Sequence, residues 1–133
     1  MSDRSESGPD EVRILRVVPE TDEVVALCLE GEFDMTNASC IIEESERVLA
    51  SDKHVILDLS QATFVDSAVI NALFHVHRQA GVHDRLAVLQ LGTAAIVEAV
   101  LEVTGVERVL PRTHTRTEAI ATIRQLARSR EDR

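Results

Sequence analysis

The stretch DLSQATFVDSAVINALF, residues 58–74, is the part of the chain that best indicates its fold. It starts inside a run of apolar residues, HVILDL at 54–59. Apolar side chains on both faces are typical of a central strand in a parallel sheet. A loop is expected to follow this strand, and Phe64 and Val65 are expected to turn back from it toward the core.

The second half of the stretch predicts an apolar helix over residues 67–80, stopped by Gly81. Ser67 is thereby placed at or next to a helix N-terminus, above the carboxyl end of a parallel strand, where open α/β sheets bind ligands. Unpaired backbone N–H groups and the helix dipole favour negative charge at such a position. A phosphoryl group on Ser67 would be tolerated there, although Asp66 and Asp34 would repel it. The local pattern alone favours a simpler role, in which Asp66 and Ser67 only cap the helix.

Strands and helices alternate along the rest of the chain, which predicts one α/β domain with the element order β-β-α-β-α-β-α-β-α. The short link ETDE suits an antiparallel hairpin between the first two strands, and the later strands are expected to be parallel. The result is a mixed, mostly parallel sheet of about five strands with about four helices. The remaining elements are predicted as strands at 12–18, 24–30, 86–91 and 107–110, and as helices over 38–49, 93–103 and 115–127.

Turn and capping residues mark the ends of these elements. The predicted end signals are Gly31 after the second strand, Thr36 or Asn37 before the first helix, Thr93 and Gly105 around the third helix, and a capping box of Thr115 with Glu118 at the last one. The helix at 67–80 is apolar nearly all round. Part of it is therefore either an exposed patch for a partner or a surface covered by neighbouring elements.

The composition indicates a small globular protein. The 133 residues are 44% hydrophobic and 28% charged, and 14 basic and 23 acidic residues make a net charge of −9, so direct binding to nucleic acid is not expected. No run reaches the roughly 18 apolar residues of a membrane span, and the first residues do not resemble a signal peptide. The expected compartment is the cytoplasm. Cys28 and Cys40 are too few for a disulfide scaffold and are expected to be buried thiols.

Motifs for catalysis and for cofactor binding are absent from the sequence. It contains neither a glycine-rich phosphate-binding motif nor a nucleophile elbow, so no catalytic residue and no cofactor is predicted. His75 and His77 are two residues apart on a predicted helix and point in different directions. They cannot chelate one metal ion together, and no metal site is predicted.

The stretch at 58–74 resembles the signature of the STAS family, the anti-sigma factor antagonist domain. The family order is followed by Asp58, Leu59, Ser60, Phe64, Asp66, Ser67 and Ala68. A second family element, G-E-F-D, is matched by Gly31, Glu32, Phe33 and Asp34, and a third by Ile96 through Gly105 with Val109. The resemblance covers residues 12–128. Residues 1–11 are then expected to be a flexible acidic tail and residues 129–133 a charged tail.

This resemblance implies a binding switch and not an enzyme. In the family, an anti-sigma factor phosphorylates the serine that follows the aspartate; it is an ATP-using serine kinase with a histidine-kinase-like fold. The unphosphorylated antagonist binds this kinase and frees a sigma factor, and phosphorylation ends the binding. The implied role is therefore transcription regulation by partner switching. Ser67 is the implied phosphoacceptor, and the implied partner-binding residues are Asp34, Asp66, Ser67, Ala68 and Val69.

Two residues next to the implied acceptor depart from the family pattern. Ala68 replaces a second serine, and Val69 stands where glycine is commonest, adding bulk beside Ser67. The absence of basic residues from Glu20 to Glu46 suits a basic partner surface.

Two alternative functions stay open. One is a phosphorylation-independent STAS subunit of a lipid-transport or stress-sensing complex. The other is a small-molecule enzyme or sensor, which requires a sizeable pocket with convergent polar groups.

Overall fold

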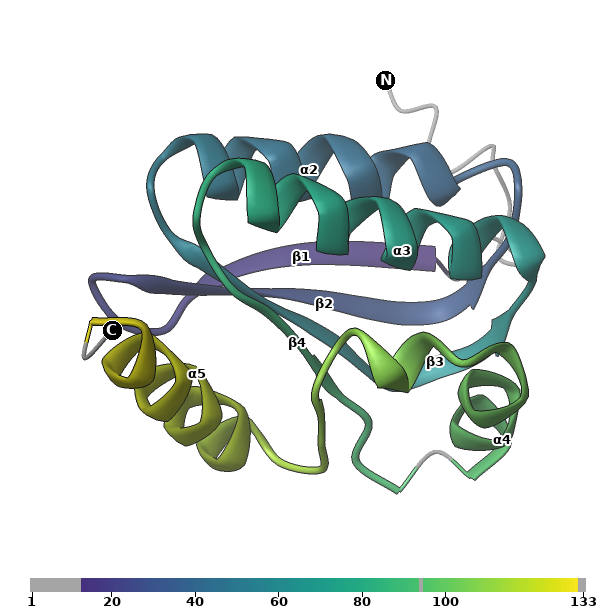
Figure 1. The fold of residues 1–133 in the computed structure, drawn as a ribbon. Helices are drawn as coiled ribbons and strands as arrows, with labels where there is room; N and C mark the ends of the chain where they lie inside the picture. The colour runs from purple at the N-terminus through teal and green to yellow at the C-terminus, as the bar shows by residue number, and fades with distance from the viewer. Residues whose placement is uncertain (1–12, 94, 132–133) are drawn as a thin grey trace.

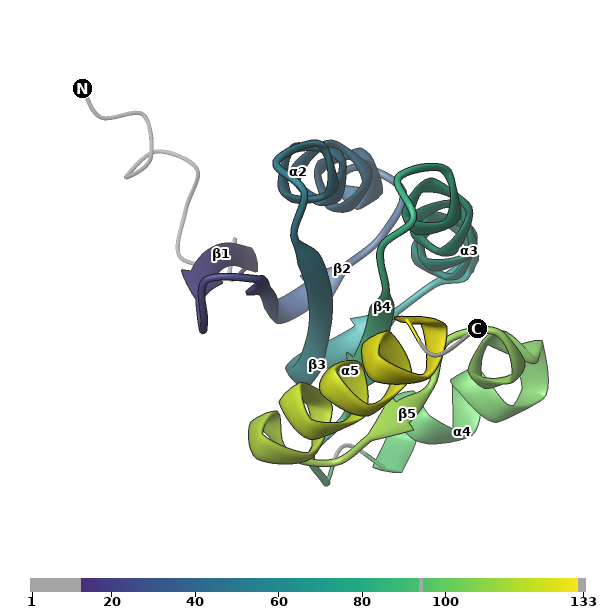
Figure 2. The same ribbon diagram turned by 60° about the vertical axis from the view of Figure 1, so that its left-hand side comes forward.

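The sheet has five strands in the order β1-β2-β3-β4-β5. Figure 1 labels β1 to β4, and Figure 2 also labels β5. β1 (Arg13–Pro19) is antiparallel to β2 (Val24–Phe33), as the hairpin prediction requires. β2, β3 (His54–Val65), β4 (Ala87–Gln90) and β5 (Arg112–Thr113) run parallel. The computed structural model describes residues 13–93 and 95–131, so the expected tail at 1–11 lies outside the described residues.

Helices cover both faces of this sheet. α2 (Ala38–Ala50) and α3 (Ser67–Val82) lie side by side over one face, and α5 (Arg116–Glu131) crosses the opposite face (Figures 1 and 2). α4 (Ala95–Thr104) packs against β3 and is followed by the 3-10 turn η1 (Val106–Arg108). The observed order of strands and helices is therefore the predicted one.

The core is almost entirely aliphatic and is divided by the sheet into two clusters. The larger cluster fills the space under α2 and α3 and continues to α4; Leu27, Leu57 and Leu73 lie in it with no exposed surface. The smaller cluster lies under α5 and includes Ala26, Ile56, Val88, Ala119 and Ile123. Because apolar residues of β2 and β3 contribute to both clusters, both strands are apolar on both faces, as the sequence pattern predicted for β3.

α3 is covered by its neighbours and does not present an apolar patch. Its apolar side chains Val69, Ile70, Ala72, Leu73 and Val76 are buried, and Phe74 is half-buried against the same core. The alternative of an exposed patch along this helix is therefore wrong.

Both motif-bearing strands are longer than predicted. β3 continues through the expected loop to Val65, and β2 continues past Gly31 to Phe33. Gly31 does not end its strand; it adopts a φ of +94° next to an irregularity in the pairing of β2 with β3, a backbone state that glycine reaches at low cost. Val65 is buried as expected, but Phe64 is 48% exposed and does not turn back to the core.

Other predicted boundaries also need correction. The strand expected at 107–110 is replaced by η1, and the edge strand β5 follows Pro111 instead of preceding it. Gly81 lies inside α3 and not beyond its end. The Asn37 side chain makes no cap bond to α2. Cys40, which was expected to be a buried thiol, is exposed on the first turn of that helix.

Two predicted end signals are present as expected. Gly105 terminates α4 with a left-handed φ of +80°. The capping box forms at α5, where Glu118 N–H donates to Thr115 Oγ1 at 3.1 Å and Glu118 Oε1 accepts the Thr115 N–H at 3.4 Å, together with the His114 N–H at 2.7 Å. Backbone hydrogen bonding from His114 holds the pKa of Glu118 below its usual range.

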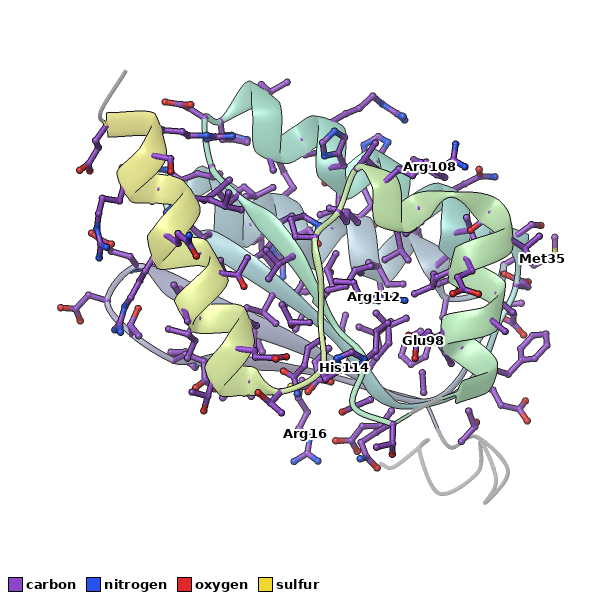
Figure 3. The ribbon with its side chains drawn as sticks, turned by 60° about the horizontal axis from the view of Figure 1, so that its bottom comes forward. Arg16, Met35, Glu98, Arg108, Arg112 and His114 are labelled. Carbon is purple, nitrogen blue, oxygen red and sulfur yellow. The ribbon has the colours of Figure 1, made fainter. Side chains whose placement is uncertain are left out.

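Side chains in β5 and directly after it fix α4 at the side of the sheet. Arg112 Nη1 donates to Glu98 Oε2 of α4 at 2.7 Å, and His114 Nε2 lies 3.9 Å from the same oxygen (Figure 3).

Gly92 provides a test of the close contact between the end of β4 and β3. It has a φ of +59°, and a Cβ at this position would lie 2.8 Å from Ser60 Cβ. We expect Gly92→Ala to lower the free energy of unfolding by about 1–3 kcal/mol, through backbone strain and overpacking. The matched control is Gly81→Ala, because Gly81 is helical and a Cβ there meets nothing within 4 Å. The control should leave stability unchanged or raise it by about 0.5–1 kcal/mol in urea denaturation. Equal stability of the two variants would contradict the assigned contact.

His54 predicts a pH dependence of stability. Its side chain is buried, and burial together with the nearby Arg85 charge lowers the pKa of His54 below the ordinary value. The neutral ring also accepts the Leu86 N–H at Nδ1, at 2.9 Å. The unfolded chain therefore binds this proton more readily than the folded one. The contribution of the neutral His54 to the free energy of unfolding should be fully present above pH about 6.5. It should be lost as the pH drops from there toward the lowered pKa.

Urea denaturation across this pH range, with His54→Gln beside the parent, measures the effect. We expect the variant to lose less stability than the parent on acidification. His77→Gln, at an exposed position on α3, is the control and should lose as much stability on acidification as the parent does. If His54→Gln and the parent lose stability in parallel, the neutral His54 is not the source of the pH dependence.

Candidate functional site

The two sequence motifs are brought together by the parallel pairing of β2 and β3. Phe33, the last residue of β2, pairs with Val65, the last residue of β3. The next residue of each strand is an aspartate, Asp34 in one and Asp66 in the other. Both motifs therefore reach the same end of the sheet on neighbouring strands.

Asp66 joins the two motifs through its carboxylate. It is the N-cap of α3, and its Oδ1 accepts the N–H groups of Ala68 at 3.0 Å and Val69 at 3.1 Å. Its Oδ2 accepts the Met35 N–H at 3.1 Å. One carboxylate thus caps α3 and holds the residue that follows Asp34.

Asp34 organises the turn between β2 and α2. Its Oδ1 accepts the Thr36 N–H at 2.9 Å and the Thr36 hydroxyl at 2.6 Å, and its carbonyl accepts the Ala38 N–H at 2.9 Å. Asn37 Oδ1 accepts the Asp34 N–H at 2.8 Å. The residues expected to cap α2 therefore close the turn instead, as Asx-type bonds do.

Ser67 is exposed as the first residue of α3, directly after Asp66. Within the described chain its hydroxyl has no hydrogen-bond partner. Ala68 is half-buried, whereas Val69 has no exposed surface and packs in the main core. Val69 therefore adds no bulk beside Ser67, and its side chain cannot contact a partner. This corrects its inclusion among the docking side chains.

The N–H groups at the start of α3 are not unpaired, which corrects a second expectation. Asp66 already accepts those of Ala68 and Val69. An anion attached to Ser67 would therefore meet a carboxylate beside the helix end, and the attraction of free N–H groups would be reduced.

The surroundings of Ser67 are acidic. Residues 30–46, which include the end of β2 and most of α2, contain no lysine or arginine, and neither do residues 60–77, from the end of β3 through most of α3. Glu32 is exposed, and Asp34 and Asp66 are half-buried. This end of the sheet therefore complements a basic surface.

The cavities described do not include these residues. One of about 310 Å³ is lined by Arg78, Arg85 and Leu126, and one of about 260 Å³ by Thr21, His54 and Ile123.

A search of the described residues finds no group of three or more His, Cys, Asp or Glu that could hold a metal ion. No helix in the described ranges is long and apolar enough to cross a membrane.

A polar cluster around Arg116 was missed by the sequence analysis. Arg116 Nη2 donates to Asp58 Oδ2 at 2.6 Å and to Cys28 Sγ at 3.3 Å, Nη1 donates to Glu20 Oε2 at 2.6 Å, and Nε donates to Gln90 Oε1 at 2.5 Å. It links the start of α5 to β2, β3 and β4. Asp58 and Gln90 are polar residues inside otherwise apolar strands, and that sequence signal could have indicated a buried partner.

The same cluster assigns a structural role to the first part of the family signature. Asp58 Oδ1 accepts both the N–H and the hydroxyl of Ser60, at 2.9 and 2.6 Å. Burial alone would lower the pKa of Arg116, but the hydrogen bond and charge of Asp58 raise it above its ordinary value. Burial raises the pKa of the half-buried Cys28 thiol.

Several solved structures share this fold. An anti-sigma factor antagonist from Mycobacterium paratuberculosis is 24% identical, with a TM-score of 0.72 over 88% of this chain and 97% of that one. An anti-sigma-factor antagonist (STAS) domain protein from Planctomyces limnophilus is 24% identical, with a TM-score of 0.65 over 82% and 97%. The Bacillus cell fate determinant SpoIIAA in its phosphorylated form is 18% identical, with a TM-score of 0.63 over 83% and 99%.

A search of curated proteins finds no match to the chain. The family model of the STAS domain matches residues 16–120, from β1 into α5. This range contains the paired ends of β2 and β3, the capped start of α3 and the Arg116 cluster. The chain therefore belongs to the STAS domain family.

Proposed function

We propose that this protein is an anti-sigma factor antagonist that acts in the cytoplasm. In this proposal it binds a cognate anti-sigma factor, a serine kinase with a histidine-kinase-like fold, and regulates transcription by partner switching. It acts by binding and not as an enzyme. The observation that carries the proposal is the exposed Ser67 hydroxyl at the start of α3, beside two aspartates on neighbouring strand ends.

The chemistry of the switch is a phosphoryl transfer from ATP. The kinase transfers the γ-phosphoryl group to Ser67 Oγ, the bond to the β-phosphate breaks, and ADP and the hydroxyl proton leave. The product carries about −1.5 to −2 additional charges at neutral pH. Ser67 is the acceptor, Asp34 belongs to the docking surface, and Asp66 shapes the turn and caps α3.

The charge of the phosphoryl group supports loss of binding. It would be added next to Asp66, in surroundings without lysine or arginine on the adjoining segments. In an interface formed around an unmodified hydroxyl, the basic groups of the partner would already be paired with the carboxylates, so a phosphoryl charge buried beside Asp66 would be poorly compensated, which is costly. The phosphorylated form of SpoIIAA shows that a protein of this fold exists in a phosphorylated state.

The test uses the purified kinase-type anti-sigma factors of the source organism with ATP, and intact-protein mass spectrometry. We expect the parent chain to gain one phosphoryl group and Ser67→Ala to gain none. Ser39→Ala is the matched control, because Ser39 is also exposed near the start of a helix, and it should be modified like the parent. Ser67→Asp should bind the kinase about tenfold or more weakly, because the new carboxylate would repel the Asp66 carboxylate that caps α3 and holds the Met35 turn.

Two results would contradict the proposal. One is undiminished phosphorylation of Ser67→Ala, and the other is equal binding of Ser67→Asp and the parent. Tight binding without any phosphorylation would instead support the phosphorylation-independent STAS subunit.

A further inference from the structure

Two exposed apolar side chains flank the Ser67 site. Met35 is 75% exposed and follows Asp34 directly, and Phe64 is 48% exposed and precedes Asp66 by two residues. Single exposed apolar residues are ordinary on protein surfaces. Two large ones at the ends of neighbouring strands, each within two residues of Asp34 or Asp66 in the sequence, require a more specific explanation.

The main chain holds both residues in place. The Met35 N–H is donated to Asp66, and Phe64 pairs with Glu32 in the parallel ladder between β2 and β3. Figure 3 shows Met35 projecting at the edge of the molecule. Little backbone ordering is therefore needed for a partner to bury them, which is the condition under which exposed apolar groups contribute most to affinity.

The frame around these residues is acidic. Glu32 lies opposite Phe64, and Asp34 and Asp66 adjoin Met35 in sequence or by hydrogen bond. α4, which packs beside β3, also contains no lysine or arginine. Apolar centres inside a charged rim are the usual anatomy of a specific protein interface.

We propose that Met35 and Phe64 are the apolar anchors of the docking surface, and that its occupant is a basic face of the anti-sigma factor. That face would bury the two side chains in apolar pockets and place arginine or lysine against Glu32, Asp34 and Asp66. This inference rests on the proposed function and identifies the partner chemistry of the same site. The anchors supply most of the affinity, while a phosphoryl group on Ser67 would repel the Asp66 carboxylate that holds the Met35 turn.

The test measures binding of each variant to the kinase selected in the phosphorylation experiment, by titration calorimetry. Met35→Ala and Phe64→Ala should each weaken binding about tenfold or more. Val82→Ala and Val17→Ala are matched controls: Val82 is 82% exposed at the far end of α3, and Val17 is 47% exposed on β1. Both controls should bind within about twofold of the parent. The thermal midpoints of all four variants should match the parent, since the replaced side chains are exposed.

The salt dependence provides a second measurement. The association rate of the parent should fall as ionic strength rises, because opposite charges steer the encounter. The association rates of Met35→Ala and Phe64→Ala should depend on ionic strength as steeply as that of the parent, and their complexes should dissociate faster. A Glu32→Gln variant should make the association rate depend less steeply on ionic strength.

The possible failures are distinguishable. If Met35→Ala and Phe64→Ala bind like the parent while Ser67→Asp does not, the anchor assignment is overturned and the proposed function stands. If the controls weaken binding as much as the anchors do, the assignment is likewise overturned. If no kinase-type anti-sigma factor binds or phosphorylates the parent chain, the proposed function itself fails.

Discussion

The change of register between β2 and β3 is the constraint on which the site depends. At the start of the ladder Val24 pairs with His54, an offset of 30 residues, and at its end Phe33 pairs with Val65, an offset of 32. The two extra residues on β3 are absorbed at irregularities near Leu29 and Gly31. Without them Asp34 would stand opposite Phe64, and the Asp66 carboxylate could not accept the Met35 N–H while capping α3. The glycine of the G-E-F-D motif, with its positive φ, lies where the second irregularity requires it.

Local signals in the sequence were sufficient for the order of the elements and insufficient for several of their ends. Gly105 and the Thr115–Glu118 capping box act through bonds within a few residues, so their roles follow from the sequence. The extension of β3 to Val65 depends on a partner strand, because the polar stretch after Leu59 pairs with β2. β5 is only two residues long and follows Pro111. It is fixed beside β4 by the Leu89 N–H, which donates to the Pro111 carbonyl, and the Leu91 N–H, which donates to the Thr113 carbonyl. No local pattern specifies such a strand.

The same distinction applies to the site. The exposed position of Ser67 at a helix start follows from Asp66 as an N-cap, which is a local feature. The bond from Met35 to Asp66 spans 31 residues, and the Arg116 cluster joins side chains up to 96 residues apart, so both depend on strand order and register. Val69 was misplaced for a related reason. It was included because it stands in the first turn after Ser67, within the family signature, but the packing of α2 and α3 on the sheet buries it.

The position of Asp66 also determines how a charge added at Ser67 would affect the surrounding structure. At an ordinary helix N-terminus an added anion is stabilised by the free N–H groups and the helix dipole. Here a carboxylate already accepts two of those N–H groups, and its second oxygen holds the neighbouring turn. A phosphoryl group on Ser67 would compete with that carboxylate for the same donors and repel it. The effect would therefore reach beyond Ser67 to the Met35 turn, because the Asp66 carboxylate is bonded to both. Modification would then change the charge of the docking surface and weaken the bond that positions one of its apolar residues, while the two core clusters stay intact.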